Sequence, residues 1–580
     1  MLDTTHHRKV DPIMKIVIVG GVAVGASAAA RLRRLDEAAE IVVFERSGCI
    51  SYANCGLPYH IGGVIDDPAA LTLQTPAGFA SRFRVKAHVH HEVTAIHPDR
   101  KTVSVTNLDT GAAFEERYDK LILAPGAKPT VPPFEKAAAD RLFTLRTVED
   151  TLRIKDYIRT RQPKSAVLAG GGFISLELAE NLRALGMDVT IVQSHTQLLS
   201  PFDADMAAFI HNELREAGVR LLLGCAVAGA AHRDDGVDVL LSDGTALHAD
   251  MAVLAIGVTP DTALAKDAGL ALGIRGSILV NDRMETSVPD IYAGGDAVQV
   301  KHFVTGEDTL IPLAGPANRQ GRIIADNICG RDSRYRGSQG SSILKVFDLT
   351  AAVTGINEAE ARAAGIDADF VILSPMSHAG YYPGGSTMTM KVLFEKETFR
   401  LLGAQIVGGE GVDKRIDVLA TAIRAGIPGT ALKDLELAYA PPYSSAKDPV
   451  NMAGFLIDNI ASGTLKQWHI ADAAALPRDG SAVLLDTRTH GEYRRGHIEG
   501  FVNIPVDALR ERIGEIPRGK PVYVICQSGL RSYIASRILA GYGFDAYNFS
   551  GGFRFWDAVM NDRRQSGPAY PCGMERQESN

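Results

Sequence analysis

The stretch KIVIVGGVAVG, residues 15–25, determines the fold of the N-terminal part of the chain. Its β-branched residues predict a buried strand that ends at Gly20, and residues 26–35 predict a helix after a glycine-rich turn. A second apolar run, residues 41–44, ends at Glu45. This order of strand, turn, helix and strand is typical of a parallel sheet whose turn holds the phosphates of a nucleotide.

The same pattern returns about 150 residues further along, where SAVLA, residues 165–169, runs into three glycines. A helix to Leu185 and a second strand that ends at Gln193 are predicted to follow. Because one such unit binds one dinucleotide, the repeat predicts two dinucleotide-binding domains.

The first turn carries groups that suit FAD. Its N–H groups and helix dipole face a pyrophosphate, and Glu45 is placed to bond the adenosine ribose, while Val22 replaces the middle glycine of GxGxxG. Asp296, after the double glycine of IYAGGD, is placed to accept a ribityl hydroxyl; the alternative is a helix N-cap. The residues predicted to bind FAD are Gly20, Gly21, Val22, Ala23, Gly25, Glu45, Arg46, Asn54, Ala124, Gly126, Gly295 and Asp296.

The second turn favours a nicotinamide nucleotide. Ser175 stands at the third glycine position and Gln193 at the position that reads the ribose. An acid there favours NADH and a nearby arginine favours NADPH. No Arg or Lys lies within several residues of Gln193, so the sequence favours NADH and leaves NADPH possible. The residues predicted to bind this nucleotide are Gly170, Gly171, Gly172, Phe173, Ile174, Gln193 and Gly257.

A cysteine in SYANCGLPY, residues 51–59, is the candidate redox group. Cys55 precedes a glycine that allows close approach of a planar ring, and a helix start and a flavin would both favour its thiolate. The alternative is a buried structural cysteine. One active thiol implies a mixed disulfide, a persulfide or a sulfenic acid as the oxidised form.

Three motifs make residues 14 to about 460 resemble the pyridine-nucleotide disulfide oxidoreductases with a single active cysteine, above all the coenzyme A disulfide reductases. They are SYANCGLPYHIGG (51–63), IYAGGDA (291–297) and YAPPYSSAKDP (439–449). The sequence departs from the family pattern at Val22, Pro125, Ser175 and Gln193.

The resemblance implies that Cys55 is the redox cysteine and that coenzyme A is a substrate or a tightly bound ligand. It also implies that Arg34, Ser51 and Asn54 contact coenzyme A or orient the thiol. Tyr439, with Tyr381 or Tyr382, would reach the site from the second subunit of a homodimer. Family members with an internal dithiol have four residues between its cysteines, whereas five residues lie between Cys49 and Cys55, so Cys49 is interpreted as incidental.

The C-terminal part has a second reactive cysteine in CQSGLRS, residues 526–532. Cys526 follows a predicted strand and precedes a helix, so that loop N–H groups, the helix dipole and Arg531 would stabilise a thiolate or an anion. With DTRTHGEYRRGHIEG (486–500) and SGGF (550–553), this loop gives residues 475–565 a resemblance to the rhodaneses, which bind sulfane sulfur. An inactive rhodanese-like module usually lacks the cysteine. Asp486 and Arg488 are predicted to form a buried structural ion pair.

Composition excludes several other classes. The 580 residues are 46% hydrophobic and 22% charged, with a net charge of −7, which gives no basis for nucleic-acid binding. The sequence contains no apolar run of about 18 residues, so no membrane-spanning helix is predicted. The six cysteines form no CxxC pair of the kind that would indicate a metal site. We expect a cytoplasmic enzyme without a bound metal.

The predicted fold class is α/β, with two Rossmann-like dinucleotide-binding domains, an α+β dimerisation domain and a C-terminal rhodanese domain. The predicted limits are 14–150 for the first part of the FAD-binding domain, 151–275 for the NAD(P)H-binding domain, 276–335 for the second part of the FAD-binding domain, 336–463 for the dimerisation domain and 470–565 for the rhodanese domain.

The leading functional hypothesis is NAD(P)H-dependent reduction of a coenzyme A persulfide, a polysulfide or coenzyme A disulfide at Cys55, with sulfane sulfur held at Cys526. A fused sulfur-binding domain favours persulfide or polysulfide over a plain disulfide. One alternative is an NADH oxidase or peroxidase that cycles Cys55 through sulfenic acid; peroxidase relatives carry a histidine in the first turn, where this chain has Ala23 and other groups without acid–base chemistry. Another alternative makes the tail a docking module that passes sulfur to a partner protein.

Overall fold

The computed structural model of the chain describes residues 13–131 and 140–566. The first nucleotide unit contains a five-stranded parallel sheet in the order β18–β7–β1–β2–β3. These strands are β1 (Lys15–Val19), β2 (Glu40–Phe44), β3 (Val85–His88), β7 (Lys120–Leu123) and β18 (Ile291–Ala293). Helix α1 (Ala23–Leu35) packs on α8 (Ala314–Ile328), and β18 and α8 show that this unit is completed by a late segment of the chain.

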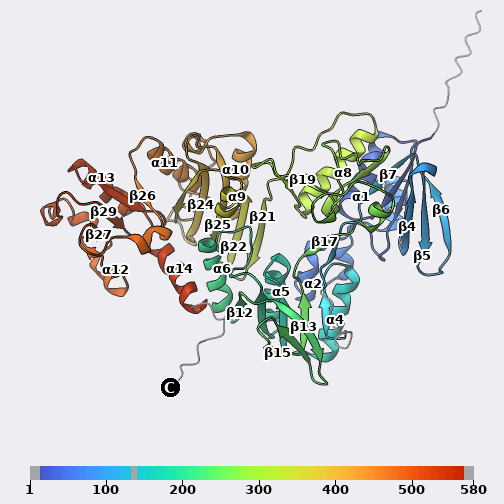
Figure 1. Ribbon diagram of the computed structural model, residues 1–580, viewed down its shortest axis with the longest axis horizontal. Coiled ribbons are helices and arrows are strands. Elements are labelled where there is room, and N and C mark those ends of the chain that lie inside the picture. The colour runs from blue at the N-terminus through green and yellow to red at the C-terminus, as the bar shows by residue number, and fades with distance from the viewer. Residues whose placement is uncertain (1–12, 132–139, 567–580) are drawn as a thin grey trace, which may run out of the picture.

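Smaller elements surround this sheet. An antiparallel sheet of β4 (His91–His97), β5 (Thr102–Asn107) and β6 (Ala113–Arg117) lies at the end of the molecule in Figure 1. The other elements are α2 (Leu57–Ile61), α3 (Pro76–Phe83), α7 (Ala263–Asp267), β19 (Val300–Lys301) and β20 (Asp308–Thr309). Strands β8 (Ala127–Pro129) and β17 (Val258–Pro260) pair where the chain passes between the two nucleotide units.

The second nucleotide unit repeats the architecture with the strand order β12–β11–β10–β16–β9. Its parallel strands are β9 (Leu142–Thr144), β10 (Ser165–Ala169), β11 (Asp188–Gln193), β12 (Arg220–Leu223) and β16 (Met251–Leu254). Its helices are α4 (Val148–Arg161), α5 (Phe173–Ala184) and α6 (Ala204–Glu216), and a small antiparallel sheet has β13 (Val227–His232), β14 (Val237–Leu241) and β15 (Ala246–Ala249). Glycine turns therefore follow β1 and β10, the central strands of the two parallel sheets.

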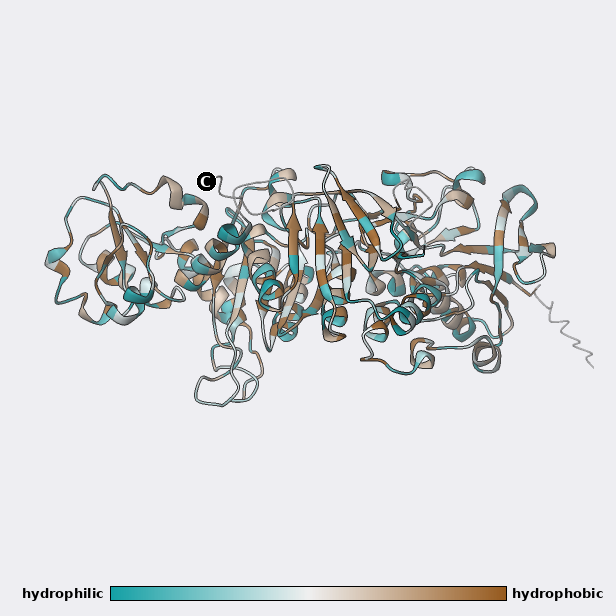
Figure 2. Cartoon of the chain, turned by 90° about the horizontal axis from the view of Figure 1, so that it is seen from below, coloured by the Kyte–Doolittle hydropathy of each residue, from teal (hydrophilic) through white to brown (hydrophobic). Residues whose placement is uncertain are grey.

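The third unit is a five-stranded antiparallel sheet covered by helices. Its strand order is β21 (Ser342–Val346), β22 (Leu349–Gly355), β25 (Leu401–Gly408), β24 (Met388–Glu395) and β23 (Ala368–Leu373). Its helices are α9 (Glu358–Ala363), α10 (Val412–Ala425) and α11 (Pro449–Ala461). Strands β24 and β25 are buried almost throughout, and Figure 2 shows the hydrophobic bands along the central strands.

The C-terminal unit is a parallel sheet at the opposite end of the molecule from the N-terminal sheet (Figure 1). Its order is β26 (Gln467–Trp468), β30 (Ala546–Phe549), β29 (Val522–Ile525), β27 (Val483–Asp486) and β28 (Val502–Asn503), with helices α12 (His490–Arg495), α13 (Leu530–Gly541) and α14 (Gly552–Ser566). In the described part of the chain, no helix combines the length and hydrophobicity that a bilayer crossing requires.

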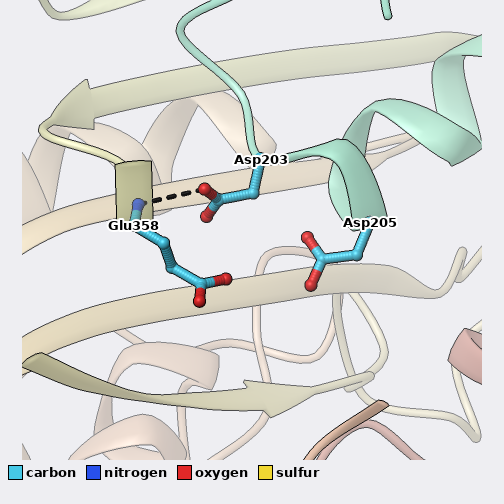
Figure 3. Close-up of side chains that lie close together, drawn as sticks. All are labelled: Asp203, Asp205 and Glu358. Carbon is cyan, nitrogen blue, oxygen red and sulfur yellow. Dashed lines mark hydrogen bonds between the residues drawn. The ribbon is translucent and has the colours of Figure 1, made fainter. Parts of the chain in front are cut away.

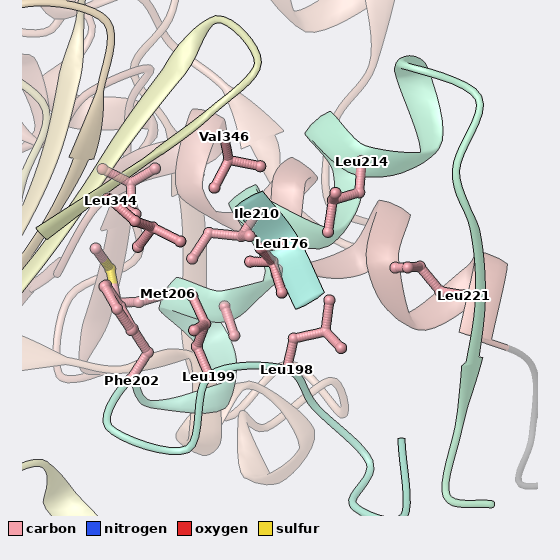
Figure 4. Packing of buried hydrophobic residues seen from close by; sticks show 14 of the residues in the cluster. Leu176, Leu198, Leu199, Phe202, Met206, Ile210, Leu214, Leu221, Leu344 and Val346 are labelled. Carbon is pink, nitrogen blue, oxygen red and sulfur yellow. The ribbon is translucent and has the colours of Figure 1, made fainter. Parts of the chain in front are cut away.

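One hydrophobic cluster joins three of these units. Phe202, Met206 and Ile210, on α6 or just before it, pack with Leu344 and Val346 of β21 (Figure 4). The same cluster includes buried residues of α14 in the C-terminal unit. Because burial of apolar surface holds all three together, we infer that α6 fixes the position of the C-terminal unit.

Candidate active sites

A cavity of about 1020 Å3 lies where the two nucleotide units and the antiparallel unit meet. It brings together predicted residues from both nucleotide sets and the candidate thiol: Val22, Ala23, Asn54, Cys55, Ala124, Gly126, Gly172, Phe173, Ile174, Gly257, Gly295 and Asp296. The other predicted residues lie outside its lining: Gly20, Gly21, Gly25, Arg34, Glu45, Arg46, Ser51, Gly170, Gly171, Gln193, Tyr381, Tyr382 and Tyr439.

The first glycine turn allows a very close approach of backbone. Gly20 has φ +95°, and a Cβ there would lie 2.2 Å from the Ala124 oxygen; a Cβ on Gly25 would lie 1.9 Å from the Gly20 oxygen. Neither position accepts a side chain without backbone movement. Glu45 accepts the Gly21 N–H at 2.8 Å, so the acid is held against the turn as the fingerprint predicts. Arg46 instead pairs with an acid outside the turn, Asp261, at 3.0 Å.

The second turn has the same design with two differences. Gly170 has φ +105°, and a Cβ there would lie 2.3 Å from the Ala255 oxygen. Ser175 is fully buried, and its hydroxyl has no hydrogen-bond partner among the described residues. Gln193 ends β11 and packs beside Gly171, and its predicted contact with the ribose stays a prediction.

Cys55 lies in a single 3₁₀ turn, Asn54–Gly56, directly before α2, and is exposed to the cavity. Burial of the thiol, followed by the carboxylates of Glu177 and Asp296, raises the pKa of Cys55, and Arg146 opposes this in part. The sequence predicted a thiol shifted toward thiolate, which is wrong for the groups that the chain itself supplies. The reason is that α2 has only five residues, and desolvation with two nearby acids outweighs its dipole.

Sequence reasoning missed five charged residues of this cavity, and two of them, Glu177 and Arg146, act on the Cys55 thiol. Glu177 projects from α5, and burial raises its pKa to about 7, opposed by the Tyr59 hydroxyl 3.4 Å away. It lies one turn after Phe173 on the same helix, and this four-residue spacing was the signal available. Arg146 forms a 2.7 Å ion pair with Asp296, 150 residues away in sequence, and no local signal indicated it.

The predicted residues of the FAD and substrate sets differ in whether their polar groups already have a partner; Asp296 is paired with Arg146. Asp296 does not cap a helix, because the cap position of its 3₁₀ turn is Gly294, which removes the alternative interpretation. The Asn54 side-chain oxygen is buried and has no partner in the described part of the chain, although the residue lines the cavity. Ser51 sits at φ +48° and donates its backbone N–H to Gly21, whereas Arg34 is exposed on α1.

The predicted tyrosines lie on the surface of the antiparallel unit. Tyr381 is 76% exposed, and its hydroxyl lies 2.8 Å from that of Tyr439. Tyr382 is also exposed. None of the three lines the Cys55 cavity of its own chain.

Cys526 is fully buried between β29 and α13 in the C-terminal unit. Its sulfur accepts hydrogen bonds from the Gly529 N–H at 3.1 Å and the Ser532 hydroxyl at 3.2 Å. Arg531 was predicted to stabilise a thiolate or a bound anion together with the helix dipole. Its guanidinium makes two hydrogen bonds to Glu492, at 2.6 and 2.8 Å, and also interacts electrostatically with Cys526. The pairing with Arg531 holds the pKa of Glu492 at about 2. The signal that was missed is the hydroxyl of Ser532 inside the quoted loop.

The structural ion pair predicted in the C-terminal unit is confirmed. Asp486 and Arg488 are 0% and 1% exposed and make several hydrogen bonds, the shortest 2.7 Å. Arg488 also stacks on Phe553, 3.8 Å from the ring centre.

A cluster of three carboxylates has metal-binding geometry but encloses a lysine. Asp203, Asp205 and Glu358 lie close together (Figure 3), and Lys391 Nζ approaches all three, at 3.0 Å from Asp203 and 2.8 Å from Asp205. Burial alone would lower the pKa of Lys391, but the carboxylates raise it. The ammonium group thus occupies the position that a cation would take, and the cluster ties α6 to the antiparallel unit.

Three family profiles match consecutive parts of the chain. Residues 14–321 match the pyridine nucleotide-disulphide oxidoreductases, residues 341–449 match the dimerisation domain of that family, and residues 469–558 match the rhodanese-like domain.

Relatives cover either the first three units or nearly the whole chain. A coenzyme A disulfide reductase of Staphylococcus aureus is 38% identical over 442 residues, which are 76% of this chain and 99% of the relative. A crystal structure of reduced Bacillus anthracis CoADR-RHD has 48% identity and a TM-score of 0.92, and it covers 95% of this chain and 99% of its own. A NAD-dependent persulfide reductase from A. fulgidus has 38% identity and a TM-score of 0.88, with coverage of 94% and 100%.

Proposed function

The chain belongs to the pyridine nucleotide-disulphide oxidoreductase family, and from that premise we propose that it is an FAD-dependent enzyme that uses NADH to reduce coenzyme A persulfide, a polysulfide or coenzyme A disulfide. One observation carries the proposal: a single cavity brings Cys55 together with residues of both nucleotide-binding turns. The match to a persulfide reductase over 94% of the chain, C-terminal unit included, favours a persulfide substrate.

The residues present fit FAD. The first turn has no room for side chains at Gly20 and Gly25, Glu45 stands at the ribose position, and the buried oxygen of Asn54 needs a donor. When bound, FAD would accept a hydride from NADH and supply an electron pair to sulfur. Gly170, Gly171 and Gln193 would hold the NADH, and the absence of Arg or Lys near Gln193 supports NADH over NADPH.

The chain's own groups perform the sulfur chemistry. The Cys55 thiolate attacks one sulfur of the substrate S–S bond; that bond breaks, a bond to Cys55 forms, and a thiolate leaves. Arg146 lies close enough to offset the negative charge that develops there. Glu177 can hold a proton at its carboxyl group up to near-neutral pH and is a candidate donor to the leaving thiolate.

The site is completed by a second subunit in this proposal. The antiparallel unit matches the dimerisation domain of the family, and the exposed hydroxyls of Tyr381 and Tyr439 lie together on its surface. Placed in the partner's cavity, a phenol there would donate a hydrogen bond to the departing thiolate. Arg34 and Ser51 would contact coenzyme A at the entrance.

Cys526 would hold sulfane sulfur as a persulfide. Two hydrogen-bond donors aimed at its sulfur favour an anionic sulfur atom in that loop. The C-terminal unit packs on α6, which supports delivery of sulfur to this enzyme's own reductase units over a role as a docking module for another protein.

The test is anaerobic NADH consumption with coenzyme A persulfide, glutathione persulfide, polysulfide and coenzyme A disulfide. Cys55→Ser is expected to abolish turnover, Cys526→Ser to impair only some acceptors, and Cys49→Ser, a nearby control, to change little. Turnover of Cys55→Ser at the wild-type rate refutes the proposal. An oxidase or peroxidase is disfavoured because the lining of the Cys55 cavity contains no histidine among the described residues.

A further inference from the structure

A second cavity, of about 600 Å3, lies between the C-terminal unit and α6 of the reductase body. It borders the Cys526 loop: Gln527, the next residue after Cys526, lines it, and so does Glu492, which binds Arg531. The cavity therefore lies beside the loop of the C-terminal thiol, although Cys526 itself is buried and is not among the lining residues. Its volume suits a peptide-sized ligand.

The two walls of this cavity are held rigidly together. Asp562 of α14 bonds His211 at 3.0 Å and Arg215 at 2.6 Å, both on α6. Asn212 of α6 donates to the Ala558 carbonyl of α14 at 2.9 Å. A cavity between walls fixed in this way is formed before a ligand binds, which reduces the entropy cost of binding.

Both walls of the cavity carry charged groups. Arg495 and Arg554 come from the C-terminal unit, and in the described ranges neither guanidinium has a hydrogen bond or an ion pair. Burial also lowers the pKa of Arg554, as expected of a cation without an acidic partner. The α6 wall presents Glu216, which is likewise unpaired, and Glu213, one of whose oxygens accepts the Asp348 N–H.

Two unpaired cations on the C-terminal wall face the acids of the α6 wall. The C-terminal wall also carries Glu492, which is paired with Arg531, and Asp557, which lies 4.0 Å from Arg564. This combination of charges matches a ligand that carries both a negative and a positive group. We propose that this cavity binds the persulfide of a zwitterionic amino-acid or peptide thiol, with its carboxylate on Arg495 or Arg554 and its ammonium group on Glu213 or Glu216. The inference rests on the proposed role of Cys526 as the acceptor of sulfane sulfur. Coenzyme A suits the cavity poorly, because its phosphates would face the acidic wall and it has no ammonium group to pair there.

The transfer step needs no further reactant. The Cys526 thiolate attacks the outer sulfur of R–S–SH, the S–S bond of the donor breaks, and a new S–S bond to Cys526 forms. The donor thiolate R–S⁻ leaves with the electron pair, so charge balances and nothing is oxidised or reduced overall.

The experiment compares three donors on the full-length holoenzyme: glutathione persulfide, which is zwitterionic, mercaptoethanol persulfide, which has no charge outside its sulfur, and coenzyme A persulfide. The measurement is the rate of persulfide formation on Cys526, from rapid quenching and mass spectrometry. Wild-type protein is expected to accept sulfur fastest from glutathione persulfide. Arg554→Gln and Glu216→Gln are each expected to slow that donor roughly tenfold, the effect of one lost charged hydrogen bond, and the neutral donor less than about twofold.

Two matched variants control for the loss of charge. Arg563 is exposed on α14 outside the cavity and Glu511 is exposed elsewhere in the C-terminal unit, so Arg563→Gln and Glu511→Gln should change neither rate. FAD content and NADH consumption with coenzyme A persulfide verify that each variant is folded. Equal slowing of both donors, or no slowing, overturns the inference and leaves the role of Cys526 standing. Failure of every donor to modify Cys526 overturns both.

Discussion

Replacing Lys391 by methionine tests whether the buried charge cluster on α6 stabilises the protein. The ammonium group is 1% exposed and neutralises part of the charge of Asp203, Asp205 and Glu358. Methionine keeps most of the volume but leaves three carboxylates without a cation. Removing one partner of a buried ion pair costs about 3–5 kcal/mol. Because Glu358 is 31% exposed and retains some hydration, we expect about 3 kcal/mol.

The assay is urea denaturation of the holoenzyme, followed by fluorescence and by release of FAD. Lys391→Met should unfold at clearly lower urea, whereas Lys396→Met, which removes an exposed partner of Asp367, should lose less than about 1 kcal/mol. Adding Asp205→Asn to Lys391→Met should recover part of the loss, because the remaining charge repulsion falls. The vacated carboxylates should also bind Ca2+, so millimolar calcium should stabilise Lys391→Met and not the wild type. Equal midpoints for Lys391→Met and wild type would refute the reasoning.

Three further predictions concern the two thiols and the FAD turn. Glu177→Gln should accelerate the alkylation of Cys55 by iodoacetamide only above about pH 7. Glu177 is ionised only in that range, and the ionised carboxylate is what raises the pKa of the thiol; equal acceleration at pH 5.5 would contradict this. Gly25→Ala should purify without FAD, since the new methyl group would lie 1.9 Å from a backbone oxygen; a yellow protein would contradict it. Ser532→Ala should slow persulfide formation on Cys526 roughly tenfold without changing Cys55-dependent reduction, measured with separate assays; unchanged persulfide formation would show that the hydroxyl is dispensable.

Features determined by consecutive residues were predictable from the sequence. The two glycine turns, their strands and the α/β fold class, now confirmed by the family matches, depend on local periodicity and on backbone positions that only glycine can occupy. The buried pair of Asp486 and Arg488 is equally local. The positions of Tyr381 and Tyr439 relative to Cys55 depend on a partner subunit, and their predicted role stays a prediction.

Features that depend on contacts between distant segments of the chain could not be predicted from the sequence. Arg146 pairs with Asp296, 150 positions away in the sequence, and Arg531 pairs with Glu492, 39 positions away. No periodicity in the sequence relates residues so far apart. The sign of the Cys55 shift was wrong for a related reason. The desolvation of its sulfur comes from how separate units close around one cavity, whereas the motif shows only the helix that follows.

Helix α6 explains how a sulfur-binding unit can be joined to a reductase without a flexible tether. His211 accepts the Leu198 N–H on Nε2, and its Nδ1 lies 3.0 Å from the carboxylate of Asp562 on α14. Leu199, the next residue after Leu198, donates its N–H to the Gly171 carbonyl of the second glycine turn. The three hydrogen bonds of this series measure 3.1, 3.0 and 2.8 Å, and His211 is buried. Undocking α14 would remove Asp562 from His211, whose Nε2 binds the Leu198 N–H, so one series of hydrogen bonds connects the C-terminal unit to the second glycine turn.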